Sequence, residues 1–499
     1  MSVWRCARLH DKDFHAEQRA AGPLMLLTLF GVVAAAVGLA LLAFKRPLRD
    51  FIFVLLFSAV FGSAEAVALP MLGGASLTVP YFFVFFVILR MLLVAFKNAP
   101  LLGEAIVSNV WIVLFAVYGV IAAMFFPRLF EGAISIVSMR PLPFRVPLVF
   151  TPQNITQAVY ICLTALAAIS AYTAARMPKS ENTITYGWVL ASCAFLLFAF
   201  VDLAGFYSGA GNLMDWARTA TYAIVAQSEM GIRRISGSFT EPSSFATFGA
   251  VPLAYFSLFW LFDVKGAPSG ALALALAMAM ALSTSTTAFA MLALLFVVLV
   301  FGVVLVPMSG RVRMRKFLQL SGTIIMGLLA ALVLVLLMPS FAKTFAELAE
   351  KMTVGKASSG SAIERGQWAA QGFLAFDVSR GLGVGPGSFR SSGLFQAVLG
   401  SLGVVGVICF AMQVFQMLWV LWRTRNAKKE RFSSAAAMAA LMMLVPLLAS
   451  SAGPDPGILF GVMTGLALGR YKTSRVRAKL DREAAKAEAL EAPTAAAPA

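Results

Sequence analysis

The sequence predicts an all-α, polytopic membrane protein, and three observations lead to that fold class. Hydrophobic residues make up 60% of the 499 residues, whereas charged residues make up only 13%. A soluble domain carries about 25% charged residues, so lipid rather than water must surround most of these side chains. Apolar stretches of about 20 residues, the length that crosses a bilayer as a helix, follow one another along most of the chain.

These apolar stretches predict about 12 to 13 transmembrane helices in a single integral domain over residues 23–470. A polar N-terminal tail (1–22) precedes it, and a basic tail (471–499), expected to be a frayed helix running into disorder, follows it. The expected helices lie near 23–44, 51–69, 79–96, 105–126, 157–176, 187–207, 244–263, 268–283, 286–306, 317–338, 394–422, 433–452 and 456–470. The Ser/Thr-rich stretch 283–287 leaves one broken or re-entrant element as an alternative to two helices there.

Lys and Arg in the connections predict the orientation. They concentrate near 45–49, 311–316, 423–431 and 470–486, and these four stretches fall on one side of the expected bundle. Because short cytoplasmic loops are rich in Lys and Arg, we expect that side, with the C-terminus, to face the cytoplasm. The sidedness of the basic N-terminal tail stays open, since an odd number of helices would place it outside.

Three long loops then lie on the opposite face, near 127–156, 208–243 and 339–393. The net charge of +17 is better explained by orientation and contact with membrane lipids than by nucleic acid, because the basic residues punctuate apolar stretches. Four scattered cysteines, and two histidines that both lie in the N-terminal tail, lead us to expect no disulfide framework, no metal and no cofactor.

The long loops contain arginines where the orientation rule predicts few positive charges. Guanidinium groups bind phosphate bidentately, so as a set they favour an anionic substrate headed by phosphate. Each arginine taken alone is better explained by a lipid headgroup or an acidic partner. The loop arginines are Arg128, Arg140, Arg145, Arg218, Arg233, Arg234, Arg365, Arg380 and Arg390.

The stretch Gly231-Ile-Arg-Arg-Ile-Ser-Gly-Ser-Phe-Thr-Glu-Pro-Ser-Ser-Phe245 ends the second loop and opens a helix. Pro242 suits a first helical turn, with Ser243 or Thr240 as the cap. Free N–H groups at such a helix start attract an anion, and Glu241 is a carboxylate at the same point. An ordinary helix entry is the alternative.

The third loop offers a possible amphipathic helix over Lys343 to Met352, then Glu364, Arg365 and Trp368 at a spacing that places them on one helix face. The glycine-rich stretch 381–389 lacks the lysine of a phosphate-binding loop, so we expect a turn at the membrane surface. Arg380 and Arg390 flank this turn and are expected to face outward.

Charges inside the expected helices are few, namely Glu65, Arg90 and Asp202. Each is a functional candidate by default, and pairing of Arg90 with either acid is the alternative. So few buried charges argue against a proton-coupled transporter.

The order of several motifs resembles the O-antigen ligase and Wzy-type polysaccharide polymerase superfamily. The motifs are Arg234-x-x-Gly237-x-Phe239-x-x-Pro242, the Ser/Thr-rich stretch 283–287, Arg365-x-x-Trp368, Gly-x-Gly-x-Gly-Ser-Phe at 383–389, and Leu399-x-x-x-Gly403-x-x-Gly406. The resemblance covers roughly residues 190–470. Where ligases carry a histidine, often followed by asparagine, this chain has Ser392 and Gly393, and where a glutamate is common it has Ser401.

The resemblance implies a membrane glycosyltransferase of the GT-C type at the periplasmic face of a bacterial inner membrane. It would act on undecaprenyl-pyrophosphate-linked oligosaccharide, together with other polysaccharide assembly and export proteins. Arg234 and Arg365 would hold the pyrophosphate, with Glu241 as base and Arg233, Arg218, Arg390, Arg380 and Ser243 as further substrate contacts. The missing histidine favours a polymerase of exopolysaccharide or O-antigen repeat units over a ligase. A transporter or flippase and a scaffold subunit are the alternatives from other classes.

Overall fold

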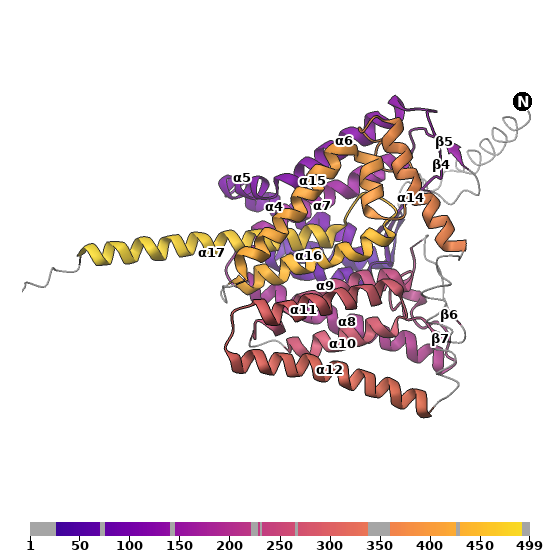
Figure 1. Cartoon of the computed structure of the whole chain (residues 1–499). Coiled ribbons are helices and arrows are strands. Elements are labelled where there is room, and N and C mark those ends of the chain that lie inside the picture. Colours follow the sequence, from indigo (N-terminus) through magenta and orange to yellow (C-terminus); the bar gives the residue numbers. More distant parts are fainter. Residues whose placement is uncertain are drawn as a thin grey trace, which may run out of the picture.

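A computed structural model describes residues 26–69, 75–139, 145–220, 228–229, 232–264, 268–337, 360–425 and 430–491. Most of the α-helices in these residues run side by side, with α14 and the short strands gathered at one end of the bundle (Figure 1). The helices are α2 (Leu29–Ala43), α3 (Leu48–Ser58), α4 (Val79–Ala95), α5 (Ala99–Ser108), α6 (Val110–Leu129), α7 (Pro152–Ala175), α8 (Ser180–Tyr207), α9 (Pro242–Leu261), α10 (Ser269–Leu282), α11 (Thr286–Leu305), α12 (Gly310–Leu337), α14 (Gly360–Val378), α15 (Leu394–Thr424), α16 (Arg431–Ser450) and α17 (Ile458–Glu491).

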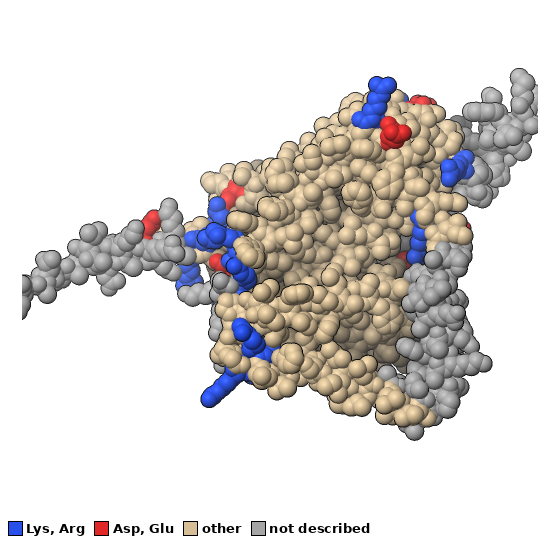
Figure 2. All heavy atoms as spheres, in the orientation of Figure 1, with Lys and Arg blue, Asp and Glu red and all other residues tan. Residues whose placement is uncertain are grey.

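Seven of the described helices are long and apolar enough to cross a membrane, namely α6, α7, α8, α9, α11, α15 and α16. Shorter apolar helices (α2, α4, α5 and α10) accompany them. The space-filling view shows a broad band without charged side chains between two charged ends (Figure 2). By the composition of its helices the chain is therefore a multi-pass membrane protein, as the sequence predicts.

The core of the bundle forms around α7, whose many small residues allow another helix to approach closely. Gly461, Gly465 and Gly469 recur every fourth residue on α17, and a Cβ at each would lie 2.0–2.5 Å from a backbone oxygen of α7. Small residues at this spacing let two helix backbones meet in the way that stabilises membrane helix pairs. At these glycines the backbone of α17 thus lies directly against the backbone of α7.

Two of the expected helices are divided into separate elements in the structure. The stretch 51–69 ends as a helix at Ser58, continues as a short 3-10 turn, and then forms strand β2 (Glu65–Leu69). This strand pairs antiparallel with β1 (Leu26–Leu27) and β3 (Ala75–Thr78), so its backbone is satisfied by neighbours instead of a helix. The stretch 105–126 is divided at Asn109 into α5 and α6. Residues 283–285 separate two helices, α10 and α11.

One end of the bundle collects the basic connections and is called the basic end here. Arg49 donates a hydrogen bond to the carbonyl of Pro178, Arg470 pairs with Glu181 at 2.9 Å, and Ser474 donates to Glu430. Arg425 lines one small pocket together with Asp263. The contacts confirm that the four basic stretches share one end.

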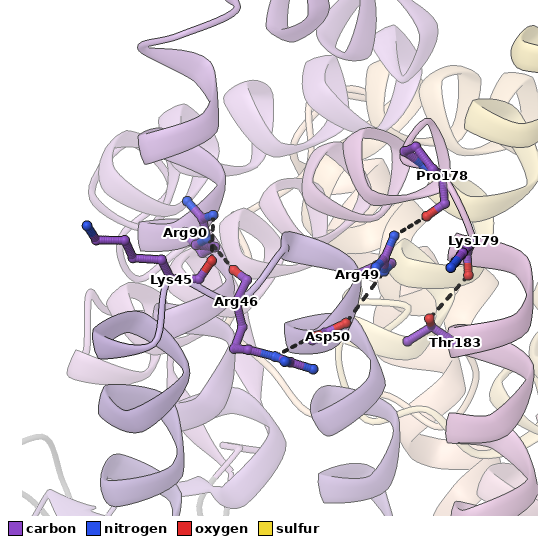
Figure 3. Close-up of polar contacts among 8 residues, drawn as sticks. All are labelled: Lys45, Arg46, Arg49, Asp50, Arg90, Pro178, Lys179 and Thr183. Carbon is purple, nitrogen blue, oxygen red and sulfur yellow. Dashed lines mark hydrogen bonds and ion pairs between the residues drawn. The ribbon is translucent and has the colours of Figure 1, made fainter.

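Arg90 belongs to the basic end, and its hydrogen bonds go to the carbonyls of Arg46 and Lys45 instead of to Glu65 or Asp202, the acids considered as its alternative partners. Its Nε donates to the carbonyl of Arg46 at 2.7 Å, just beyond the last turn of α2 (Figure 3). Arg46 in turn donates from Nε to Asp50 at 2.8 Å. A guanidinium at carbonyls that follow a helix C-terminus is the usual favourable placement of a cation.

Candidate functional site

The opposite end, called the loop end here, brings the three long loops together. The first loop contains two paired strands, β4 (Ser135–Ile136) and β5 (Val146–Pro147), and Val137 directly follows β4. The backbone N–H of Val137 donates to Gln371 of α14 at 2.8 Å, and its carbonyl accepts from the N–H of Arg390 at 2.9 Å. A separate apolar cluster, Ile134, Ile136, Leu148, Ala375, Val384 and Phe389, fills the space beneath.

The glycine-rich stretch is buried between helices, which corrects the expected surface turn. Gly383, Gly385 and Gly387 all have φ between 82° and 91°, a region that residues with a Cβ rarely occupy. A Cβ on them would lie 2.4–2.6 Å from the backbones of α15, α6 and α7 respectively. Only glycine therefore lets this irregular segment pass between the three helices.

The receiving helix is broken to hold the segment. Gly403 interrupts α15 with φ 57° and ψ −152°, which frees the carbonyls of Gly400 and Ser401 from the helix. They accept hydrogen bonds from the N–H groups of Val384 at 2.9 Å and Gly385 at 3.0 Å. Asn154, buried at the start of α7, adds bonds to the Pro386 carbonyl and the Ser388 hydroxyl. The next residues of the segment, including Arg390, are thereby held in place.

Arg390 is the best-positioned cation at the loop end. Its guanidinium carbon lies 4.5 Å from the centroid of the Trp368 ring, which extends from α14. Burial lowers the pKa of Arg390 from its ordinary value, and the negative charges of Glu241 and Glu364 oppose that shift. Arg390 is half-buried rather than facing outward as expected, and its charge is directed at two acidic groups from two different loops.

A cavity of about 360 Å³ adjoins the segment that carries this arginine, and Arg390 itself is not among its lining residues. Its walls are mainly apolar side chains of α3, α9 and α16, such as Leu55, Phe248 and Leu447. Its polar lining includes Glu241, Ser243, Ser450, Ser451 and Asp455. The backbone N–H of Gly393 donates to the Ser451 carbonyl at 2.8 Å, which joins the segment of Arg390 to the cavity wall. The site is thus an amphiphilic cavity with a cation beside it.

Asp455 is a residue of this cavity that the sequence analysis missed. It lies between α16 and α17, accepts hydrogen bonds from Thr164 at 2.8 Å and Tyr81 at 3.1 Å, and has its pKa raised by burial. The available indication was a lone acid between two prolines, Pro454-Asp-Pro456, in the short connection of two apolar helices. An acid buried at such a point is a functional candidate.

Glu241 occupies the N-cap position of α9, and no side chain caps that helix start. The expected caps make other contacts, since Ser243 donates to the Glu241 carboxylate and Thr240 donates to Ser244. Ser243 and Glu241 are therefore hydrogen-bonded to each other at the cavity wall.

Arg218, one of the expected substrate contacts, is buried inside the protein. Its side chain is 2% exposed and pairs with the fully buried Asp202 at 2.8 Å. It also donates to the Gly237 carbonyl, while Asp202 accepts from the N–H groups of Ser236 and Gly237 at 2.9 and 3.1 Å. The pair fixes the loop that carries Arg234 and Glu241.

The remaining arginines divide by position. Arg234 is half-buried. Arg365 is exposed on α14 one turn before Trp368, so Arg365 and Trp368 are neighbours on the surface of that helix. Arg380 is exposed beyond the far end of the same helix, about 20 Å along its axis from Arg365. Arg233 lies in strand β7 (Ile232–Arg233), but its side chain, Arg140 and the expected helix 343–352 lie outside the described residues.

Ser392, Gly393 and Ser401 stand where the resemblance leads one to look for histidine, asparagine and glutamate. Gly393 donates its N–H to the Ser451 carbonyl, and the Ser401 carbonyl accepts from the N–H of Gly385, so these two support the segment by backbone contacts. Among the described residues, no cluster of three or more His, Cys, Asp or Glu side chains is arranged to hold a metal ion. No protein-family model matches the chain, and no curated protein matches it either.

Proposed function

We propose that the protein is a membrane glycosyltransferase that polymerises undecaprenyl-pyrophosphate-linked repeat units into exopolysaccharide or O-antigen. In this proposal the loop end faces the periplasm of a bacterial inner membrane. Besides the seven long apolar helices, α2, α4, α10, α12 and α17 cross this membrane and α3 is the further candidate, giving 12 to 13 crossings in all. The observation that carries the proposal is Arg390, held over Trp368 beside an amphiphilic cavity lined by Glu241 and Asp455.

The chemistry of the cavity suits a lipid-linked sugar. Apolar walls accommodate an isoprenoid chain, whereas a guanidinium at the same end of the bundle binds a pyrophosphate. Arg234 and Arg365, expected from the sequence to bind pyrophosphate, belong to the two loops that meet beside Arg390. Positive charge there lowers the barrier to departure of undecaprenyl pyrophosphate by stabilising its developing negative charge.

The reaction forms one bond and breaks one. A hydroxyl of the incoming lipid-linked unit attacks the anomeric carbon of the growing chain, and undecaprenyl pyrophosphate leaves with the electron pair of the broken C–O bond. A carboxylate in the cavity accepts the hydroxyl proton. Glu241 is the proposed acceptor because its charge interacts with that of Arg390. Asp455 is the second carboxylate in the cavity.

The test is to complement a strain that lacks the protein with Arg390→Ala, Arg365→Ala or Arg234→Ala, using Arg380→Ala as the matched control. We expect the first three to lose high-molecular-weight polymer and to accumulate single repeat units on undecaprenyl pyrophosphate. Arg380→Ala should resemble the wild type, because it removes the same charge at the far end of α14. Immunoblots of membrane fractions confirm that each variant is inserted.

Other profiles identify the alternatives. Finished polymer that stays unattached to its acceptor would assign a ligase. Repeat units confined to the cytoplasmic leaflet would assign a flippase. Unchanged polymer in all three variants would remove the proposed site.

A further inference from the structure

A second cavity, of about 450 Å³, lies away from the loop-end site, among α9, α10, α11 and α12. Its lining is mostly apolar, with side chains such as Leu253, Leu274, Leu295 and Phe296. The volume is within the range of about 300–1,000 Å³ that small-molecule sites occupy. Helix α12 lies at the periphery of the bundle, so the cavity is formed at the surface that faces lipid (Figure 1).

The polar residues beside this cavity form an ordered stripe on α12. Arg311, Arg315, Gln319 and Thr323 recur every fourth residue and therefore share one face of the helix. Gln319 and Thr323 line the cavity itself, while Arg311, Arg315 and Gln319 line a shallow pocket that continues it. The stripe spans about 18 Å from its charged end to its neutral end.

The charged end of the stripe is fixed to α9. Arg315 pairs with Asp263 at 2.7 Å, and Lys316 donates to the Trp260 carbonyl at 2.5 Å. The Trp260 indole donates to Gln319 at 3.2 Å, at the boundary between the charged pocket and the apolar cavity. Hydrogen bonds from Lys316 and Arg315 hold the pKa of Asp263 below its ordinary value. Asp263 therefore offsets one positive charge, although Arg311, Arg313, Arg315 and Lys316 supply four.

We propose that this groove binds one anionic phospholipid, with the headgroup phosphate at Arg311 and Arg315 and an acyl chain in the cavity between α10 and α12. The gradient from guanidinium through amide and hydroxyl to apolar side chains follows the polarity of a phospholipid from headgroup through ester to chain. Its length matches about one leaflet of a bilayer whose apolar core is about 30 Å thick. The excess of positive charge selects an anionic over a zwitterionic headgroup.

The test is native mass spectrometry of the full chain in mild detergent, titrated with phosphatidylglycerol or phosphatidylcholine. We expect tight phosphatidylglycerol adducts on the wild type and about 30-fold weaker binding by the double variant Arg311→Gln/Arg315→Gln, since each basic group near a lipid surface contributes about 1 kcal/mol. The single variants Arg311→Gln and Arg313→Gln form the matched pair, because each removes one positive charge, from different faces of α12. Ala277→Phe, which fills the groove, should abolish the adduct while leaving the arginines intact.

Three outcomes would overturn the proposal. Equal losses for Arg311→Gln and Arg313→Gln would mean diffuse charge attraction without a site. Equal affinity for both lipids would mean a neutral lipid groove. A dimer that dissociates on Ala277→Phe would assign the groove to a second copy of the chain.

Discussion

Arg390 and Trp368 are joined across the loop end by a cation–π contact of 4.5 Å between the guanidinium carbon and the ring centroid. The two residues belong to different parts of the third loop, and the backbone of Arg390 is simultaneously tied to the first loop at Val137. The contact positions an arginine whose charge interacts with that of Glu241.

The first prediction concerns this contact. Under the proposed function, Trp368→Ala should lower the rate of sugar transfer about tenfold to 30-fold, because a desolvated cation–π contact is worth about 2 kcal/mol. Trp368→Phe, which keeps an aromatic face, should retain most of the rate. Transfer is measured in proteoliposomes with purified lipid-linked repeat units. Equal rates for the alanine and phenylalanine variants would show that the ring does not position Arg390.

A second prediction follows from the buried pair of Asp202 and Arg218. Arg218→Ala should destabilise the protein by about 3–5 kcal/mol, because it leaves a carboxylate buried without its partner. The loop at Ser236 and Gly237, whose N–H groups depend on that carboxylate, should become sensitive to protease. Thermal unfolding in detergent and limited proteolysis measure both effects.

The control for this pair is Arg46→Ala at the basic end. Arg46 pairs with Asp50 at a similar distance, 2.8 Å, but its side chain is 57% exposed. An exposed ion pair contributes about 0–1 kcal/mol, so this variant should unfold near the wild-type temperature. Similar losses for the two variants would contradict the special role of the buried pair.

The helices were predictable where a long apolar stretch is bounded by residues that end helices. The stretches expected at 79–96 and 286–306 match α4 and α11 within one residue. The structure of the stretch 51–69 was not predictable, because hydrophobic content alone does not distinguish a helix from a buried strand. Its strand β2 depends on pairing with β1 and β3, which a single stretch of sequence does not contain.

The site was predictable only in its local parts. Helical spacing correctly placed Glu364, Arg365 and Trp368 on α14. The return of Arg390 onto that helix depends on the break at Gly403 and on glycines packed against three other helices. Asp455 could not be predicted as a site residue because the cavity that it lines is built from helices far apart in the sequence.

The third prediction tests those glycines. Gly385→Ala and Gly403→Ala should sharply reduce the yield of folded protein, because each new Cβ would lie within 2.6 Å of a backbone oxygen at a positive φ. Gly366→Ala, on α14 with nothing within 4 Å of the new Cβ, should be neutral or stabilising by up to about 1 kcal/mol. Size-exclusion profiles in detergent report the folded fraction. Normal profiles for the first two variants would show that the segment has room to move.

The last prediction uses the buried acid Asp455. Burial raises the pKa of its carboxyl above the ordinary value of 3.8, against the hydrogen bonds from Thr164, the Gly457 backbone and Tyr81, which lower it. Below 3.8 the carboxyl is protonated in both the folded and the unfolded protein, so its contribution to stability is complete there. As the pH rises towards the raised pKa, the unfolded chain ionises first and the folded state loses stability. Above the raised pKa both states are ionised and the loss stays constant.

Asp455→Asn cannot ionise and should not show this loss. The difference in unfolding temperature between the wild type and Asp455→Asn should therefore shift in favour of the variant as the pH rises from about 3.8, then level off. Asp377→Asn removes an exposed carboxylate from α14 and controls for the loss of one negative charge. A wild type that instead gains stability over Asp455→Asn with rising pH would mean that the hydrogen bonds from Thr164 and Tyr81 outweigh burial. Asp455 would then be a structural anion that holds α4 and α7 to the last connection, and Glu241 would be left as the single candidate for the base.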